Sequence, residues 1–155
     1  MSEFSIAIPT HDRGEKGVVW LRELLDSIKI QTFKDFDIVI SDQSTNDNIK
    51  NVCDEYDFEF VYLRYGGENA CENLNTALEN CDGRIIKIMF SDDIFTRNDA
   101  LEIIHDEYNK LGCRWTFSGF CGTKDGVNFY EEKFPIWSDY TLEGRNLLSS
   151  PSVVS

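Results

Sequence analysis

The chain has 155 residues, 41% of them hydrophobic, so it can bury one sizeable core, and its length does not indicate two domains. The 28 acidic and 15 basic residues give a formal net charge of −13, which argues against sequence-independent binding to nucleic acid or an anionic membrane surface. No basic-then-apolar leader begins the sequence, and no window approaches the ~18 apolar residues of a membrane-spanning helix. We therefore predict a cytoplasmic protein without an integral membrane segment.

The first half of the sequence alternates apolar strands with amphipathic helices. Phe4–Pro9 is short and almost wholly apolar, which is typical of a strand covered on both faces. Apolar residues then recur at helical spacing from Gly17 to about Gln31, which predicts an amphipathic helix. Strands are predicted at Phe36–Ser41 and Phe58–Arg64, with a helix around Ile49–Tyr56 between them.

The same alternation continues through the middle of the chain. The stripe from Ala70 to Cys81 predicts a helix, and Ile85–Phe90 predicts the fourth strand. Asn98–Leu111 predicts a further helix, with Thr96 or Asn98 as its N-cap. Strands that alternate with amphipathic helices imply an α/β fold, in which a mostly parallel sheet has helices on both faces.

The pattern weakens toward the C-terminus. Arg114–Phe120 predicts a fifth strand, residues 124–130 predict a turn into a short strand, and Leu142–Leu148 predicts a short helix. The sequence contains no internal repeat, low-complexity tract or obvious linker. We therefore predict a single domain over residues 1–155.

Polar residues follow three of the predicted strands. Pro9–Arg13 follows the first, Asp42–Ser44 the second and Ser91–Asp93 the fourth. Ligands of open α/β sheets bind outside the carboxyl ends of the strands, so we expect these segments on one rim. The adjacent carboxylates of Asp92 and Asp93 suit Mg²⁺ or Mn²⁺, which prefer carboxylate oxygens and also bind substrate phosphates.

Each of these residues also has an ordinary structural interpretation. Asp92 and Asp93 fit a solvated turn after a strand, and Asp42 fits a turn former or an Asx cap. Thr10 and Arg13 fit unspecialised loop residues. The residue pattern alone leaves both interpretations open.

Three stretches of the sequence resemble a known family. SIAIPTHDR, LRELLDSIKIQTFKDFDIVISDQST and ENLNTALENCDGRIIKIMFSDDIF resemble, in order, segments of family 2 glycosyltransferases with the GT-A (Rossmann-like) fold, up to that family's DxD metal motif. The resemblance extends from about Phe4 to the last residue. It implies an inverting transfer of a sugar from a nucleotide diphosphate donor, a UDP-sugar, to a saccharide, lipid-linked or other hydroxyl acceptor, with Mn²⁺ or Mg²⁺ as the cofactor.

Residue roles follow from the resemblance position by position. It implies a metal at Asp92 and Asp93 and a nucleotide-sugar site that comprises Thr10, Arg13, Asp42, Asn73 and Asp92. In that site Asp42 is expected to accept a hydrogen bond from the base or the ribose. Two positions depart from the family pattern: Phe90 stands at the first acidic position of the DxD motif, and Glu72 stands where a basic residue often precedes Asn73.

The resemblance also implies that a part is missing. The sequence stops at NLLSSPSVVS, where family members continue into the acceptor-binding half that carries the catalytic base. We therefore expect a GT-A-like domain that is truncated at this half, with an unknown base. No neighbourhood marks any of the acids after the predicted fifth strand as that base: Asp125, Glu131, Glu132, Asp139 and Glu143.

Three function classes remain open on the sequence. The first is an active glycosyltransferase, and the second is a nucleotide-sugar-binding fragment without turnover. The third is a Mg²⁺-dependent phosphoryl-transfer or receiver-type α/β protein that uses the acidic pair. A receiver carries its acidic pair after the first strand, whereas Asp92 and Asp93 follow the fourth.

Overall fold

The computed structural model describes residues 1–112, 116–117, 121–123, 129–131 and 153–154. Strands and helices alternate through the first four strands, as the sequence predicts. In chain order the elements are β1 (Phe4–Thr10), α1 (Lys16–Lys29), β2 (Phe36–Asp42), α2 (Asn48–Cys53), β3 (Phe60–Arg64), α3 (Ala70–Glu79), β4 (Ile85–Ile88), α4 (Ala100–Leu111), β5 (Thr116–Phe117), β6 (Cys121–Thr123), β7 (Phe129–Glu131) and β8 (Val153–Val154).

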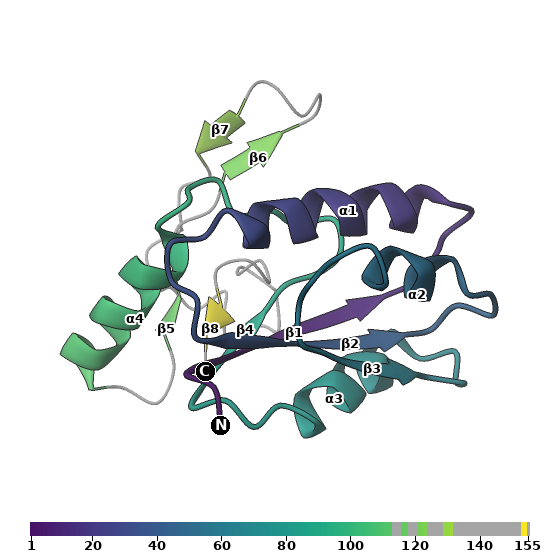
Figure 1. The fold of residues 1–155 in the computed structure, drawn as a ribbon, viewed down its shortest axis with the longest axis horizontal. Coiled ribbons are helices and arrows are strands. Elements are labelled where there is room, and N and C mark those ends of the chain that lie inside the picture. The colour runs from purple at the N-terminus through teal and green to yellow at the C-terminus, as the bar shows by residue number, and fades with distance from the viewer. Residues whose placement is uncertain (113–115, 118–120, 124–128, 132–152, 155) are drawn as a thin grey trace, which may run out of the picture.

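Six of the strands form one sheet in the order β3-β2-β1-β4-β8-β5 (Figure 1). The first four strands of the chain pair in parallel, whereas β8 pairs antiparallel with both β4 and β5. Strands β6 and β7 form a separate antiparallel pair. The prediction of an α/β fold with a mostly parallel sheet is therefore confirmed.

Strand β1 lies between β2 and β4 and is buried along its whole length. Its almost wholly apolar sequence follows from that position, because neighbouring strands cover both edges and helices cover both faces. The register places Thr10 beside Asp42 of β2, and Asp42 beside Arg64 of β3. The ends of three strands therefore meet at one rim of the sheet.

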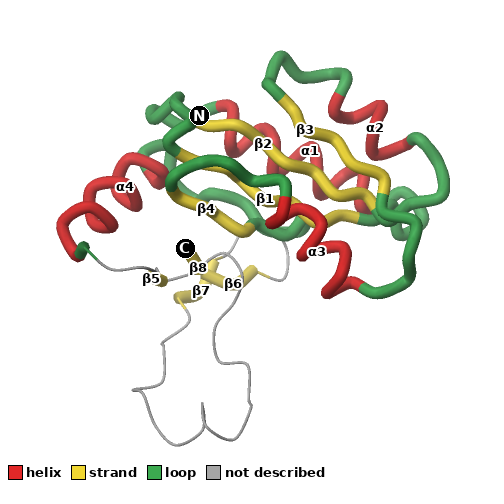
Figure 2. Tube along the Cα trace, turned by 90° about the horizontal axis from the view of Figure 1, so that it is seen from below, coloured by secondary structure: helices red, strands yellow, loops and turns green. Residues whose placement is uncertain are grey.

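Helices cover both faces of the sheet (Figures 1 and 2). Helices α1 and α2 lie on one face, and α3 lies on the other. Leu101 of α4 belongs to the same buried cluster as Leu24 and Leu25 of α1. On the opposite face, Ala77 of α3 packs with Ala7 and Val39 of the two central strands. Small residues there let α3 approach the sheet closely.

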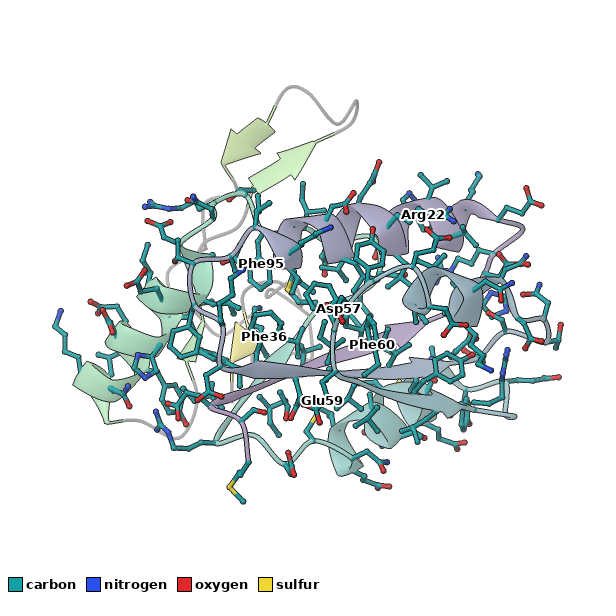
Figure 3. All side chains as sticks on the ribbon, viewed as in Figure 1. Arg22, Phe36, Asp57, Glu59, Phe60 and Phe95 are labelled. Atoms are coloured by element: carbon teal, nitrogen blue, oxygen red, sulfur yellow. The ribbon has the colours of Figure 1, made fainter. Side chains whose placement is uncertain are left out.

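Aromatic side chains fill the larger layer, between the sheet and α1 (Figure 3). Phe95 is buried in the main cluster, and the half-buried rings of Phe36 and Phe60 pack against it. The ring of Phe58 stacks on Tyr56 at a centroid separation of 5.8 Å. Burying a side chain of this size stabilises the fold by about 1.5–3 kcal/mol.

Helix α4 begins differently from the sequence prediction. Its N-cap is Asp99, which makes no side-chain cap hydrogen bond, so the prediction of Thr96 or Asn98 is wrong. The buried side chain of Gln31, just beyond α1, takes the capping role instead. Its Oε1 accepts from the Leu101 N–H at 3.1 Å, and its Nε2 donates to the Arg97 carbonyl at 2.7 Å.

Several C-terminal predictions fall partly or wholly outside the described residues. Of the predicted fifth strand, the structure describes Thr116–Phe117 as β5, and the strand predicted within 124–130 corresponds in part to β7. The helix predicted at Leu142–Leu148 lies outside the described residues. Among the residues described, none of the helices is both long and apolar enough to span a membrane.

Candidate functional site

Two adjoining cavities open at the carboxyl rim of the sheet. The smaller has a volume of about 320 Å³ and the larger about 740 Å³, and both are bordered by His11 and Gln43. The smaller cavity is further lined by Pro9, Thr10, Arg13, Trp20, Ala70, Asn73, Phe90, Ser91 and Asp92. The structure thus brings together four predicted binding residues, Thr10, Arg13, Asn73 and Asp92, around one cavity.

Asn73 ties three elements together beneath the smaller cavity. Its side chain is buried on α3, where its Oδ1 accepts from the Ser41 hydroxyl at 2.6 Å and its Nδ2 donates to the Thr10 carbonyl at 3.2 Å. The helix that carries it begins at Asn69, whose side chain accepts from the Cys71 N–H. Asn73 therefore fixes the ends of β1 and β2 relative to α3.

The hydroxyl of Thr10 is a buried polar atom without a partner. Thr10 is 4% exposed, and its Oγ1 makes no hydrogen bond within the described part of the chain. A buried hydroxyl left unpaired costs about 1–3 kcal/mol. Because Thr10 lines the smaller cavity, a ligand in that cavity can supply the missing partner.

The loop between β1 and α1 is held in an unusual conformation. Arg13, Gly14 and Glu15 all have positive φ, at 49°, 67° and 74°, a region that residues with a side chain seldom occupy. The Arg13 N–H donates to Nδ1 of His11 at 2.8 Å. Gly17 is essential to this loop, because a Cβ there would lie 2.0 Å from the His11 carbonyl oxygen.

Asp12 anchors the same loop to the neighbouring one. Its carboxylate accepts from the Glu15 N–H at 3.0 Å and from the Asn46 amide at 2.8 Å, and its own N–H donates to the Ser44 hydroxyl. The hydrogen bond from Asn46 is the main cause that lowers the pKa of Asp12 below its usual value. The Asp12 side chain is buried, with 7% exposed, and its hydrogen bonds join the two loops, so we infer that it positions them.

Asp42 is enclosed by hydrogen-bond donors of its own chain. Its side chain is fully buried, and its Oδ1 accepts from the Ser44 N–H at 2.8 Å. Its Oδ2 accepts from the Tyr62 hydroxyl at 2.6 Å and lies 3.0 Å from the Arg64 guanidinium. Burial, followed by the hydrogen bond to Asp42, raises the pKa of Tyr62. Asp42 lines neither of the two cavities, so its predicted contact with a base or ribose stays a prediction.

Asp92 and Asp93 lie in the turn that follows β4. Asp92 is exposed and lines the smaller cavity, whereas the Asp93 Oδ2 accepts from the Phe90 N–H at 3.1 Å. Within the described ranges, no three His, Cys, Asp or Glu side chains gather into a group that could hold a metal ion. Mg²⁺ and Mn²⁺ are often bound by one or two carboxylates together with substrate phosphates, so this pair fits such a cation.

A buried lysine lies next to this turn. Lys87 of β4 is 1% exposed, and its Nζ donates to the Ile88 carbonyl at 3.3 Å. Burial lowers the pKa of Lys87 to about 7, while the charge of Asp93 acts in the opposite direction. A buried lysine was not predicted here, because Lys87 stands within an otherwise apolar strand.

Several cavity residues escaped prediction from the sequence. Trp20 reads as one member of the apolar stripe of α1, but its half-exposed side chain lines the smaller cavity. Phe90 is 39% exposed and lines the same cavity. It stands at the first acidic position of the DxD motif in the family that the sequence resembles. Of the acids after the predicted fifth strand, none of which was assigned as the base, Glu131 ends β7, and the others lie outside the described residues: Asp125, Glu132, Asp139 and Glu143.

Comparison with known proteins shows the family to which this chain belongs. The sequence profile of "Glycosyl transferase family 2" matches residues 5–150, and the chain therefore belongs to this family of glycosyltransferases. Membership sets aside the phosphoryl-transfer and receiver-type alternative, and it confirms the resemblance seen in the sequence.

The similar curated proteins are bacterial glycosyltransferases. An uncharacterized glycosyltransferase of Rickettsia felis is 30% identical over 105 residues, which are 66% of this chain and 16% of that protein. A GalNAc(5)-diNAcBac-PP-undecaprenol beta-1,3-glucosyltransferase of Campylobacter jejuni is 28% identical over 60% of this chain and 30% of its own length. The chain thus matches less than a third of either relative.

Solved structures share the fold. S. aureus TarS 1–349 in complex with UDP superposes with a TM-score of 0.64 at 20% identity, over 73% of this chain and 34% of that one. The complex of the same protein with UDP-GlcNAc gives a TM-score of 0.61 at 21% identity. These similarities establish a GT-A-like fold for this chain.

Proposed function

We propose that this chain binds a UDP-sugar at the carboxyl rim, as the donor site of an inverting, metal-dependent glycosyltransferase. The observation that carries the proposal is the smaller cavity, around which Thr10, Arg13, Asn73 and Asp92 gather from separate segments of the chain. TarS, which shares the fold, has been crystallised with UDP and with UDP-GlcNAc.

The polar groups of the cavity suit the parts of such a donor. The Thr10 hydroxyl lacks a partner and can bind a donor hydroxyl or carbonyl group. Among the described residues that line the smaller cavity, Arg13 is the only arginine or lysine, and we assign it to the diphosphate. Asn73 lines the cavity and ties the ends of β1 and β2 to α3 through its two side-chain hydrogen bonds.

Asp92 and Asp93 would hold the divalent cation. When bound, the cation offsets the negative charge of the diphosphate, which a protein of net charge −13 otherwise repels. The Phe90 N–H donates to Asp93 and so fixes the orientation of that carboxylate. Since Phe90 replaces the first carboxylate of the family motif, we expect modest affinity for the cation.

The reaction itself needs a group beyond those assigned so far. In an inverting transfer, the acceptor oxygen bonds to the anomeric carbon on the face opposite the diphosphate, whose bond to that carbon breaks. The hydroxyl proton passes to a base within about 2.6–3.2 Å, directly or through one water. We propose that this base, and the residues that bind the saccharide or lipid-linked acceptor, are not among the described residues.

Calorimetric titration with UDP tests the proposal. We expect binding in Mn²⁺, loss of most affinity in EDTA, and an affinity about tenfold or more lower for Asp93→Asn, since loss of a charged ligand costs about 1.5–3 kcal/mol. Asp57→Asn, a change to an exposed acid outside the cavities, is the matched control. Equal affinity in Mn²⁺, in EDTA and with Asp93→Asn would remove the cation from the proposal.

A second measurement separates the two remaining function classes. The protein is incubated with UDP-sugars, Mn²⁺ and a panel of saccharide acceptors, and UDP release and product mass are followed. Acceptor-dependent release supports an active transferase. UDP-sugar binding without acceptor-dependent release supports the alternative of a binding fragment without turnover.

A further inference from the structure

The turn at residues 90–93 contains both carboxylates of the proposed cation site, and it is held by different elements at its two ends. Before the turn, the Met89 N–H donates to the Ala7 carbonyl of β1 at 3.0 Å. After the turn, the Phe95 N–H donates to the Ser27 hydroxyl of α1 at 3.1 Å. The chain thus enters the turn from the sheet and leaves it against α1.

Two hydrogen bonds join the first and last residues of the 90–93 turn. The Asp93 N–H donates to the Phe90 carbonyl at 3.0 Å, and the Phe90 N–H donates to Asp93 Oδ2 at 3.1 Å. Because the turn is closed in this way, we expect it to move as a unit when the backbone after it moves. The position of Phe95, which follows shortly after Asp93, therefore affects both carboxylates.

Ser27 is a buried polar residue on the apolar side of α1. It is 8% exposed, and its neighbours Leu24 and Ile28 are fully buried. Its Oγ donates to the Leu24 carbonyl at 2.7 Å and accepts from the Phe95 N–H. A buried backbone N–H needs a partner, and the Ser27 hydroxyl is the partner of Phe95. The hydroxyl therefore fixes the backbone that follows the turn.

Gln31, just beyond α1, extends the same link along the chain. Its side chain is 1% exposed, its Nε2 donates to the Arg97 carbonyl at 2.7 Å, and its Oε1 accepts from the Leu101 N–H at 3.1 Å. Nε2 also donates to the Ser27 carbonyl at 3.1 Å. Side chains at the end of α1 thus hold the backbone from Phe95 to the first turn of α4.

The same helix also borders the smaller cavity. Trp20 of α1 lines this cavity together with Asp92 of the turn and with Arg13, which lies in the loop before the helix. Trp20 and Ser27 are about two helical turns apart in the sequence, so they lie on the same side of α1. One side of the helix therefore contacts both the cavity and the backbone that follows the turn.

We propose that Ser27 is a positioning residue for the divalent cation. Its hydroxyl holds the Phe95 backbone, and through it keeps Asp92 and Asp93 where they bind the cation together with the diphosphate. This proposal rests on the proposed function, which assigns the cation to the same two carboxylates. Ser27 lines neither of the two cavities, so it acts through the turn and not by contact with the ligand.

Ser5 provides a matched control at the opposite end of β4. Its side chain is fully buried, and its Oγ accepts from the N–H of Gly83, which precedes β4, at 2.8 Å. Ser27→Ala and Ser5→Ala therefore each remove a buried hydroxyl that accepts from a backbone N–H next to β4. Both variants should lose stability for this reason. The N–H that pairs with Ser27 follows the 90–93 turn, whereas the one that pairs with Ser5 lies at the amino rim.

The test measures how much Mn²⁺ each protein needs in order to bind UDP. UDP is titrated calorimetrically at a series of Mn²⁺ concentrations into the wild type, Ser27→Ala, Ser27→Thr and Ser5→Ala, at a temperature where all four are folded. We expect Ser27→Ala to need about fivefold more Mn²⁺ for half-maximal UDP affinity, and to match the wild type in EDTA. Ser5→Ala, and Ser27→Thr, which keeps the hydroxyl, should need as much Mn²⁺ as the wild type.

The outcomes separate this inference from the function on which it rests. If the wild type does not bind UDP, or binds it equally in Mn²⁺ and in EDTA, the proposed function fails and the inference fails with it. If the wild type requires Mn²⁺ and Ser27→Ala needs no more of it, the inference alone is overturned. An equal increase in Ser5→Ala would also overturn it, because lost stability would then explain the effect. So would a Ser27→Thr protein that needs as much Mn²⁺ as Ser27→Ala.

Discussion

The sheet has two rims, the carboxyl rim with the two cavities and the amino rim at the opposite ends of the strands. Both contain a buried polar atom, but only one of these atoms lies next to a cavity. Each rim contains a buried side-chain oxygen without a hydrogen-bond partner among the described residues: Thr10 Oγ1 at the carboxyl rim and Asp37 Oδ1 at the amino rim. Thr10 faces a cavity, whereas Asp37 lies near the carboxylate of Asp82. Such an atom therefore indicates a binding site only where space for a ligand adjoins it.

One group of charges at the amino rim is paired within the protein. Arg84 pairs with Glu3 and donates to Asn109 at 2.8 Å, and His105 lies 3.1 Å from Glu3. The hydrogen bond from Arg84 is the main cause that lowers the pKa of Glu3. At the carboxyl rim, by contrast, Thr10, Asp92 and Gln43 present polar atoms to the cavities. The carboxyl rim therefore differs in the polar atoms that it presents to the cavities, since it too contains an internally paired acid, Asp42.

Two glycines provide the largest expected effects and a direct comparison of the rims. A Cβ on Gly17 would lie 2.0 Å from the His11 carbonyl oxygen, and a Cβ on Gly83 would lie 2.4 Å from the Ser5 nitrogen. Since backbone atoms cannot yield as side chains do, we expect Gly17→Ala and Gly83→Ala each to lose about 3 kcal/mol of unfolding free energy in urea. At a temperature where both variants stay folded, only Gly17→Ala should bind UDP more weakly.

A wild-type UDP affinity in both folded glycine variants would contradict this expected difference between the rims. It would mean that the β1–α1 loop can shift without consequence for the ligand. A loss of affinity in Gly83→Ala as large as that in Gly17→Ala would instead couple the two rims through β1.

Thr10→Val is expected to have an intermediate effect that is confined to binding. The substitution keeps the shape of the side chain and removes a hydroxyl that has no partner in the protein, so stability without ligand should be unchanged or slightly higher. UDP affinity should fall by about 1 kcal/mol, or roughly fivefold. Thermal unfolding and calorimetric titration measure the two quantities.

Thr32→Val is the matched control, because the Thr32 hydroxyl donates to Glu102 away from the cavities. It should leave UDP affinity unchanged. A Thr10→Val protein that is less stable without ligand but binds UDP normally would show that the Thr10 hydroxyl serves the fold.

Asp37→Asn is expected to have the smallest effect, and it should raise the free energy of unfolding where the glycine substitutions lower it. Burial, the largest cause, raises the pKa of Asp37, and the nearby charge of Asp82 acts in the same sense. A raised carboxyl pKa favours the protonated form in the folded state, so stability is lost as the pH rises through the folded pKa. At pH 7 the variant should therefore be more stable, by about 1 kcal/mol or less.

The difference should vanish near pH 3, where the carboxyl is protonated in both the folded and the unfolded protein. Thermal unfolding at the two pH values, with the exposed Asp35→Asn as control, measures it. A variant that is less stable than the wild type at pH 7 would show that the ionised carboxylate is stabilising, and would remove the contrast between the rims.

The strands and their succession along the chain were largely predictable from the sequence, but their order in the sheet was not. The apolar run at Phe4–Pro9 and the run at Phe36–Ser41 correspond to β1 and β2 within one residue at each end. Such runs are informative because a strand buried on both faces has no solvent-facing positions. The gathering of Thr10, Arg13 and Asp92 followed from the rule that ligands bind at the carboxyl ends of parallel strands, whereas Asn73 was predicted from the family resemblance alone.

The remaining features depend on contacts between distant parts of the chain. The cap of α4 comes from Gln31, 70 residues before the N–H that it accepts. The enclosure of Asp42 needs Tyr62 and Arg64 in register on the adjacent strand. Trp20 has the helical spacing of a core residue, and only the packed structure shows that it borders a cavity. The pattern of neighbouring residues in the sequence does not predict any of these three contacts.

The position of β8 in the sheet has a consequence for the order of events during synthesis. Val154 of β8 pairs with Lys87 of β4, and β8 also separates β4 from β5. The three strands β1 to β3 are complete by Arg64, so they can associate while the ribosome is still translating the later segments. Strand β4, which precedes the turn with Asp92 and Asp93, gains its second neighbouring strand only after residues 153–154 emerge. Until those residues emerge, the nascent chain therefore exposes the edge of β4 that later pairs with β8.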